Sequence, residues 1–397
     1  MLTIDKVKDA ARVLSQVVNN TDILHMPIKC DNDVYLKTEN LQVTGSFKVR
    51  GAYYKISKLS DEEKKRGVIA CSAGNHAQGV ALAAQKNGIP ALICLPEGAP
   101  ISKIEATRSY GAQIMLVPGV YDDAYQRAIE LQREHGYTFI HPFDDEDVIA
   151  GQGTLSLEIL EEMPSLDAIV VPIGGGGLIS GVAFAAKQIK PSIKVYGVQA
   201  SNASSMYNSI KEDRAIKLAS VNTLADGIAV KQPGDLTFDF TKHYVDEIFT
   251  VNEAEIYTAI LTLIEKKKMV AEGAGAVALA AAMFNKLPIS NKKVCCVVSG
   301  GNIDVNRLSR VITQGLLNTG RRAMITIQLK DTHGQLSAAL QCIAKLGANV
   351  ISAQHERLAA NGDIDTCYLK MELETRNFEH IQSIKATLHG NGFSIIV

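Results

Sequence analysis

The sequence predicts an α/β chain in two parts, a large region of mostly parallel sheet followed by a small β-α-β-β-α-β domain. Between about residues 68 and 298, short apolar runs rich in β-branched residues alternate with helix-like segments, which is typical of βαβ units. After about residue 318 the rhythm changes to the order of a split βαβ unit. The length of 397 residues also favours more than one folding unit.

The predicted strands of the large region are the apolar runs at residues 67–71, 91–95, 113–117, 168–173, 194–199 and 293–298. The helix-like segments are residues 78–87, 101–110, 122–135, 179–189 and 252–268. The first of these helices has a clear end, because Gly88 follows it and Pro90 comes shortly after. We therefore expect parallel sheet covered by helices.

The C-terminal region is predicted to begin after a polar hinge at residues 319–323. Its predicted strands are residues 324–330, 349–357, 365–374 and 393–397, and its predicted helices are residues 335–346 and 378–389. The two middle strands would be joined by a turn at residues 359–363 that contains an Asn-Gly pair. The predicted domains are therefore residues 1–318 and 324–397.

Composition and charge argue against several classes of partner. The 41 basic and 42 acidic residues nearly cancel, so nothing favours nucleic acid or an anionic membrane surface. No apolar run approaches the roughly 20 residues of a membrane span, and the N-terminus lacks the apolar core of a signal peptide. The seven cysteines include no Cys-x-x-Cys pair, and we expect them to be reduced in a cytoplasmic protein.

The first candidate site residue is Lys48, which follows a short turn containing Gly45 and precedes a helix-like stretch. A lysine is most often a solvated side chain, so only its surroundings can favour a catalytic role. Phe47 lies beside it in the chain and could shield one side of a flat ring. Whether Lys48 is a good candidate for a catalytic residue therefore depends on the other motifs.

A second candidate is the segment of small and polar residues Ser72, Ala73, Gly74, Asn75 and His76. It follows a predicted strand and opens a helix, whose start presents free N–H groups and a partial positive charge. A bound carboxylate would suit this loop. The alternative is an ordinary strand-to-helix turn with a serine or asparagine cap, and the histidine is either a base or a packed side chain.

Four successive glycines, Gly174 to Gly177, come between a predicted strand and the next helix. Each glycine lowers stability, because it loses more conformational freedom on folding than other residues do. Packing alone is therefore a poor explanation for four glycines in a row, and we expect a cradle of N–H groups around a phosphate. Two nucleotide-binding alternatives fail. A dinucleotide fingerprint lacks its last glycine, since Ile179 or Ser180 stands there, and a Walker loop would need a lysine directly after the glycines.

The third glycine-containing strand end is the segment Ser299 to Asn302, after the strand predicted at residues 293–298. In an open α/β sheet, ligands collect beyond the carboxyl ends of the strands. The loops at residues 72–79, 174–178 and 299–302 are therefore expected to converge on one crevice. A lysine, a phosphate cradle and polar strand ends are the parts that a pyridoxal-phosphate (PLP) site requires.

Together, and in this order, the four motifs resemble those of the fold-type II PLP enzymes, and among them the threonine and serine dehydratase group, over roughly residues 1 to 315. The resemblance implies two open, mostly parallel sheets flanked by helices, with a smaller subdomain at roughly residues 45–145. It also implies PLP as the cofactor and a small hydroxy amino acid as the substrate. The expected oligomer is a homodimer or a homotetramer.

The resemblance gives each motif a role. Lys48 would bind PLP as a Schiff base and later remove the substrate α-proton, with Phe47 packed nearby. Asn75 would hydrogen-bond the ring hydroxyl, and Ser299 would contact the pyridine nitrogen. The phosphate would lie at Gly174, Gly175, Gly176, Gly177 and Leu178. The substrate would lie at Ser72, Ala73, Gly74, Asn75 and His76.

The implied reaction is a β-elimination that converts L-threonine to 2-oxobutanoate and ammonia, and L-serine to pyruvate. Serine racemases resemble this sequence closely, but they carry a second serine that protonates the opposite face of the substrate carbanion. Here the position is occupied by Ala73, whose side chain has no proton to donate. Racemisation is therefore disfavoured. The alternatives are a serine racemase, a serine-specific dehydratase and a non-catalytic amino-acid sensor.

The same resemblance guides three further expectations. No metal site is predicted, because Gln199 stands where many relatives place an acidic cation ligand. Glu272 matches a family acidic residue near the ring, although a glutamate at a helix start is often only a partner of the helix dipole. The C-terminal segment resembles a single ACT regulatory domain, whose strand–helix turn at residues 331–336 often binds an amino acid. The alternative is a dimerisation module without a ligand.

Overall fold

The structure is a computed structural model that describes residues 2–357 and 365–396. The chain divides into two compact units, Met1–Val305 and Asn306–Val397. Among the described residues, no helix combines the length and the apolar character that crossing a membrane requires.

The larger sheet of the first unit has six strands in the order β1-β2-β10-β7-β8-β9. Only the pair β1 and β2 is antiparallel, and the other neighbouring pairs are parallel. The strands are β1 (Ile23–His25), β2 (Asp33–Lys37), β7 (Ala168–Pro172), β8 (Lys194–Ala200), β9 (Glu247–Val251) and β10 (Lys293–Val297). Every residue of β7 is buried, as expected of a parallel strand with helices on both faces.

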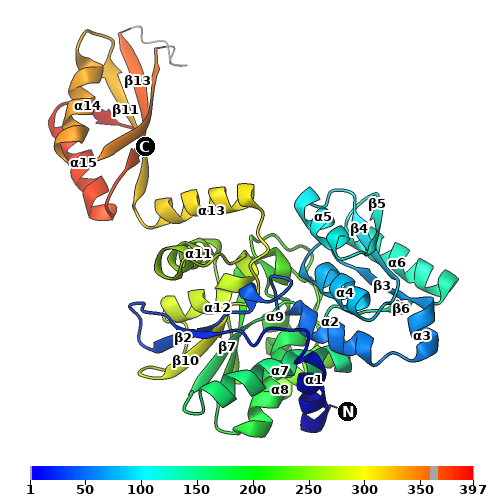
Figure 1. Cartoon of the computed structure of the whole chain (residues 1–397). Helices are drawn as coiled ribbons and strands as arrows, with labels where there is room; N and C mark the ends of the chain where they lie inside the picture. Colours follow the sequence, from blue (N-terminus) through cyan, green and yellow to red (C-terminus); the bar gives the residue numbers. More distant parts are fainter. Residues whose placement is uncertain (1, 358–364, 397) are drawn as a thin grey trace. The chain divides into compact units, whose positions relative to one another are not determined.

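The smaller sheet is entirely parallel, with the strand order β5-β4-β3-β6. Its strands are β3 (Val68–Cys71), β4 (Ala91–Pro96), β5 (Gln113–Val117) and β6 (Thr138–Phe139). Figure 1 shows this sheet with its surrounding helices, which are α4 (Asn75–Lys86), α5 (Ile101–Ser109) and α6 (Tyr121–His135). The first unit therefore has two lobes, each built on its own sheet.

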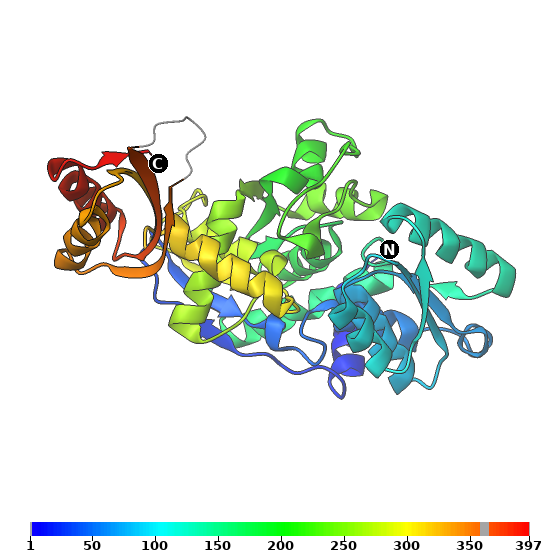
Figure 2. The same ribbon diagram turned by 90° about the horizontal axis from the view of Figure 1, so that it is seen from above.

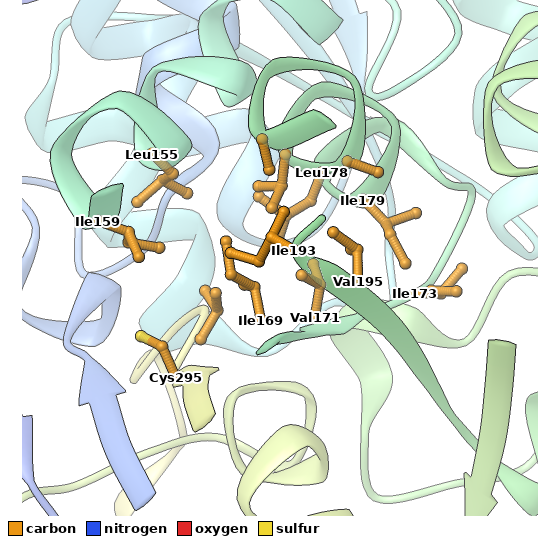
Figure 3. Packing of buried hydrophobic residues seen from close by; sticks show 14 of the residues in the cluster. Leu155, Ile159, Ile169, Val171, Ile173, Leu178, Ile179, Ile193, Val195 and Cys295 are labelled. Carbon is orange, nitrogen blue, oxygen red and sulfur yellow. The ribbon is translucent and has the colours of Figure 1, made fainter. Parts of the chain in front are cut away.

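The remaining helices of the first unit mostly cover the larger sheet, whereas Lys48–Ser57 packs in the core of the smaller lobe and Asp61–Arg66 lies beside that lobe (Figure 1). They are α1 (Ile4–Leu14), α2 (Lys48–Ser57), α3 (Asp61–Arg66), α7 (Glu146–Glu162), α8 (Gly177–Ile189), α9 (Ser205–Lys211), α10 (Asp235–Tyr244), α11 (Glu253–Lys267) and α12 (Gly273–Met283), with short 3-10 turns η1 (Glu39–Leu41), η2 (Ser201–Ala203) and η3 (Asp226–Ile228). The core lies where α7 and α8 pack on β7 and β8 (Figure 3). Leu155, Ile179, Ile169 and Val195 are among the fully buried side chains there.

The predicted alternation of strands and helices is confirmed, with two informative differences. Helix α4 begins at Asn75 and not at residue 78, so Asn75 and His76 belong to the first turn of the helix. Helices α7 and α12 were not predicted. Helix α12 is almost entirely buried and consists of Gly, Ala and other apolar residues, so it has no polar face and no amphipathic period to detect.

The second unit has the predicted β-α-β-β-α-β order. Its elements are β11 (Arg322–Lys330), α14 (Gln335–Lys345), β12 (Asn349–Glu356), β13 (Thr366–Glu374), α15 (Phe378–Gly390) and β14 (Ser394–Ile395), preceded by α13 (Val305–Asn318). The sheet is antiparallel in the order β12-β13-β11-β14, and α14 and α15 lie on one of its faces (Figure 2). The division between the units places α13 with this unit, whereas the sequence placed the boundary at residues 319–323. The turn predicted at residues 359–363 lies outside the described residues.

Candidate active site

Lys48 is the first residue of α2, and the loop after β10 fixes the turn that precedes it. The Phe47 N–H donates to the Ser299 carbonyl at 3.1 Å, and the Gly301 N–H donates to the Gly45 carbonyl at 2.9 Å. Gly45 has a φ of +68°, which other residues rarely adopt. The backbone of one predicted motif therefore holds the backbone of another, although the two are far apart in the sequence.

The Lys48 amine is buried and has few polar partners. Its Nζ donates to the Pro142 carbonyl at 2.7 Å and lies 5.2 Å from the centroid of the Phe47 ring. Burial lowers the pKa of Lys48 to about 8, while the charge of Glu272 acts in the opposite direction. An amine that loses its proton so readily can act as a nucleophile or as a base near neutral pH.

Asn75, Glu272 and Asn302 form a hydrogen-bonded chain across three loops. The Asn75 amide donates to Glu272 Oε1 at 2.6 Å, and the Asn302 amide donates to Asn75 Oδ1 at 2.8 Å. The Asn302 amide also donates to the Thr44 carbonyl at 2.8 Å, which ties the chain to the turn before Lys48. The loops at residues 72–79 and 299–302 therefore do converge.

Glu272 is the N-cap residue of α12 and is 3% exposed. Burial, and then the charge of Asp226, raise the pKa of Glu272 to about 7, against the effect of Lys103 and the Asn75 hydrogen bond. Lys103 Nζ lies 2.7 Å from Asp226 Oδ2 and so connects α5 of the small lobe with η3 of the large one. Glu272 is thus an acid that can hold or release a proton near neutral pH.

The segment from Ser72 to Gly74 is an open loop, and the packed His76 follows it in the first turn of α4. The Gly74 N–H donates to Ser72 Oγ at 3.2 Å, and no described atom lies within 4 Å of the point where a Cβ on Gly74 would lie. His76 is buried, and its Nε2–H donates to the Ile140 carbonyl at 2.8 Å. Burial, and then the charge of Lys48, lower the pKa of His76 to about 3, so the structure favours the packed histidine over the base.

The glycine loop Gly174 to Gly177 joins β7 to α8 in a closely packed turn. A Cβ on Gly175 would lie 2.3 Å from a ring carbon of Phe143, and a Cβ on Gly177 would lie 2.8 Å from the Phe143 Cβ. Gly176 has a φ of +102°. Close packing therefore also requires small residues here, a cause that the sequence pattern alone did not indicate.

Helices α4 and α8 both begin at this site, with Gly74 and Gly176 as their N-cap residues. A glycine has no side chain with which to cap a helix, so the first N–H groups of both helices are presented to a ligand. Each helix start also carries a partial positive charge. The two starts are suited to two anionic groups, such as a phosphate and a carboxylate.

The glycine loop is connected to the lysine through neighbouring segments. Phe143, which packs on Gly175, follows Pro142, whose carbonyl accepts from Lys48. Leu178 and Ser299 are nearly fully buried, and Ser299 Oγ donates to the Ala274 carbonyl at 3.3 Å. The site therefore combines a buried amine, an aromatic ring, a neutral hydroxyl and two helix starts that are suited to anions.

This combination on an open parallel sheet defines the class of enzymes that bind a phosphorylated carbonyl cofactor through a lysine. The chain belongs to the family described as pyridoxal-phosphate dependent enzymes, whose model matches residues 14–300. It is a fold-type II member with an additional C-terminal antiparallel sheet. The residues described above fit PLP by their chemistry, since they offer an amine for its aldehyde and N–H groups for its phosphate.

Comparison with known proteins gives close relatives. The chain is 51% identical to the L-threonine ammonia-lyase of Thermotoga maritima over 398 residues, which cover 100% of this chain and 99% of the relative. The solved structure of threonine deaminase isoform 2 from Solanum lycopersicum is 37% identical, with a TM-score of 0.75, over 78% of this chain and 93% of that one. The structure of maize serine racemase is also 37% identical, with a TM-score of 0.74, over 80% and 98% of the two chains.

Three features of the site were not predicted. Asn302 belongs to the segment Ser299 to Asn302, but no role was predicted for it, although an amide close to a strand end is a recognisable signal. The ion pair of Lys103 and Asp226 joins residues that are far apart in the chain. The Pro142 carbonyl, which binds the Lys48 amine, is a backbone group that no side-chain pattern could reveal.

Proposed function

We propose that this protein is a PLP-dependent lyase that converts L-threonine to 2-oxobutanoate and ammonia, and also L-serine to pyruvate. The observation that carries the proposal is the buried Lys48 amine, with its pKa lowered to about 8, in the same site as two uncapped helix starts. The full-length similarity to an L-threonine ammonia-lyase supports the choice of substrate.

In this proposal the motifs divide the tasks among them. Lys48 binds the cofactor, Phe47 packs against it, Asn75 binds its ring hydroxyl and Ser299 faces its ring nitrogen. The phosphate is held by N–H groups of Gly174, Gly175, Gly176, Gly177 and Leu178. The substrate carboxylate lies at the start of α4, among Ser72, Ala73, Gly74, Asn75 and His76, where the histidine contributes through its backbone because its ring is bound to Ile140.

PLP, when bound, supplies an electron-withdrawing ring that stabilises negative charge at the substrate α-carbon. The Lys48 amine takes the α-proton, for which its lowered pKa makes it suitable. The β-hydroxyl takes up one proton and leaves as water, which balances the α-proton that Lys48 has removed. The released product is then hydrolysed by water in solution to the oxo acid and ammonia. The neutral hydroxyl of Ser299 limits the spread of charge into the ring, which favours prompt elimination.

A serine racemase is the second candidate, since a racemase structure covers 80% of this chain at 37% identity. Racemisation needs a proton donor on the face of the substrate opposite Lys48. Ala73 has only a methyl group at the position where the racemases carry a serine, so elimination is favoured. A serine-specific dehydratase differs from the main proposal only in its substrate.

The test is to incubate the purified PLP-loaded enzyme with L-threonine and L-serine, and to measure oxo acids, ammonia and the chirality of the remaining serine. We expect 2-oxobutanoate from threonine at a higher kcat/KM than pyruvate from serine. Predominant formation of D-serine would identify a racemase. Absence of oxo acid from both substrates would favour an amino-acid sensor.

We also propose that residues 324–397 form an ACT-like regulatory domain, following a catalytic domain at residues 1–318 and a hinge at 319–323. This domain contains a pocket of about 530 Å³ that is lined by the turn at residues 331–336 together with Leu329, Lys330, His355 and Arg357. A pocket of this size accommodates an amino-acid effector. Measurement of threonine turnover with and without isoleucine or valine tests this role, and no change with either would favour a dimerisation module.

The oligomeric state and the compartment are part of the same proposal. We infer a homodimer or homotetramer, which sedimentation of the PLP-loaded protein would distinguish from a monomer. The seven cysteines are free thiols, in agreement with the reducing environment of the cytoplasm.

A further inference from the structure

Three side chains of different chemistry meet at one end of the C-terminal sheet. They are Asp331, His355 and Cys367, which come from three neighbouring strands in the order β12-β13-β11. His355 lies on β12, Cys367 lies on β13, and Asp331 directly follows the last residue of β11. None of them has a role in the catalytic proposal.

The strand register explains why the three side chains share one face. Cys367 is opposite Leu329, and Asp331 is two residues beyond Leu329, so both point to the face of the sheet that Leu329 occupies. His355 is opposite Leu369, which is two residues beyond Cys367. The side-chain alternation of a strand therefore brings all three to the same face.

The distances suit a single metal ion. The nearest ligand atoms of the three residues all lie within 4.8 Å of one another, and His355 Nε2 lies 3.0 Å from Cys367 Sγ. A tetrahedral zinc ion with bonds of about 2.0–2.3 Å places its ligand atoms about 3.3–3.8 Å apart. Small rotations of the side chains therefore suffice to bind the ion.

The three side chains of the cluster differ in their exposure to solvent. Cys367 is 2% exposed, whereas Asp331 and His355 are exposed and line the pocket of the C-terminal unit. An ion bound by the three residues would have the buried sulfur on one side and the pocket on the other. A fourth coordination position would thus be open to water or to a small ligand, as in zinc sites with three protein ligands.

Arg357 is the nearby cation with which the ion must compete. Its Nε lies 3.4 Å from Asp331 Oδ1, and its side chain is 70% exposed. An exposed ion pair of this kind contributes little to stability, so its displacement costs little. The released guanidinium would remain at the pocket, which it also lines.

We propose that Asp331, His355 and Cys367 bind a divalent transition-metal ion, of which Zn²⁺ is the best match. A thiolate, an imidazole and a carboxylate are ligands that zinc accepts, whereas Mg²⁺ and Ca²⁺ prefer oxygen alone. On binding, the thiol releases its proton to the solvent, and the sulfur then forms the bond to the metal. The site lies outside the catalytic unit and does not depend on the catalytic proposal.

The test uses the full-length PLP-loaded protein, freed of metal with a chelator and then titrated with zinc chloride in a calorimeter. We expect tight binding that is weakened at least tenfold in each of Asp331→Asn, His355→Ala and Cys367→Ser, since even loss of an outer partner of a metal ligand costs about 10–100-fold. The matched control is Cys342→Ser, a cysteine of α14 in the same unit that lies outside the cluster. Its zinc affinity is expected to match that of the unsubstituted protein.

Asp331 and His355 are exposed, so their variants test the site even if the buried Cys367→Ser variant folds poorly. Cobalt(II) provides a second measurement, because a cobalt–thiolate bond gives an absorption band that is visible after the cofactor spectrum is subtracted. We expect this band in the unsubstituted protein and in Cys342→Ser, and we expect it to be absent in Cys367→Ser. Zinc binding that is equally strong in Asp331→Asn and His355→Ala would overturn the proposal, as would a cobalt band that survives in Cys367→Ser.

Discussion

Helix α2 carries two cations, the half-buried Lys48 and the fully buried Arg50, whose surroundings differ completely. Arg50 donates to both oxygens of Glu39 at 2.8 Å and to Glu158 Oε1 at 2.5 Å, and it also donates to Thr154 Oγ1 at 3.1 Å. Lys48 donates to a single carbonyl, that of Pro142. Only two positions along the helix thus separate a charge with many partners from an amine with few.

The two environments move the pKa values in different ways. Burial alone would raise the pKa of Glu39, but the charge of Arg50 brings it below its ordinary value. At the other site, burial dominates and brings the pKa of Lys48 to about 8 and that of Glu272 to about 7. Paired charges therefore stay charged and hold the fold, whereas sparsely paired groups can exchange protons near neutral pH.

The largest expected effect follows from removing the sparsely paired amine. Lys48→Ala should lower kcat/KM for threonine by about 10⁴-fold or more, because no other group can bind the cofactor and take the proton. It should also abolish the absorbance of the lysine-bound cofactor, while thermal unfolding of the cofactor-free protein changes little. Lys58→Ala, at the surface end of α2, is the matched control and should keep its activity. Comparable activity in both variants would show that the Lys48 amine is not required for the reaction.

Removing the paired cation should affect stability first. Arg50→Met leaves Glu39 buried without its main partner, so we expect the free energy of unfolding to fall by about 3–5 kcal/mol. Urea unfolding measures this change. Arg12→Met is the control, because Arg12 is 80% exposed in its pair with Asp9 and should change stability by only about 0–1 kcal/mol. Equal losses in the two variants would contradict the structural role of Arg50.

A smaller effect is expected where the site is held by packing. In Gly175→Ala the new Cβ would lie 2.3 Å from a carbon of the Phe143 ring, so we expect a loss of about 1–3 kcal/mol in stability and weaker PLP binding. Gly98→Ala is the control, since no described atom lies within 4 Å of its added Cβ. Fluorescence titration with PLP and urea unfolding measure the two quantities. Unchanged PLP affinity in Gly175→Ala would show that the loop tolerates a side chain.

The least direct expected effect is a change in pH dependence. The carboxyl of Glu272 has an ordinary pKa of 4.5 and a pKa of about 7 in the folded chain, so the folded protein binds the extra proton between these values. Its contribution to the stability of the cofactor-free protein should therefore fall as the pH rises from 4.5 to about 7. Urea unfolding across this range should show a weaker fall in Glu272→Gln. Identical pH profiles would contradict the raised pKa.

The sequence predicted the alternating strands and the three strand-end loops because their signals are local. Apolar runs, glycine clusters and helix starts are visible within a few residues. These signals together made Lys48 a candidate for the cofactor-binding residue. The packing of Phe143 on the glycine loop and the pairing of Arg50 with Glu158 were not predictable, because their partners are far apart in the chain. The cluster of Asp331, His355 and Cys367 was missed for the same reason, since only the strand register brings it together.

The network behind Arg50 also restricts how this enzyme can change over evolutionary time. Glu158 accepts from Arg50 and from Lys37, while Glu39 accepts from Arg50 and Thr21. A single substitution leaves a buried charge without its partner, whereas simultaneous replacement of both partners by apolar residues is often tolerated. Change at these positions therefore requires compensating substitutions in the partner residues, so few of the possible single-step mutations lead to a stable descendant of this sequence.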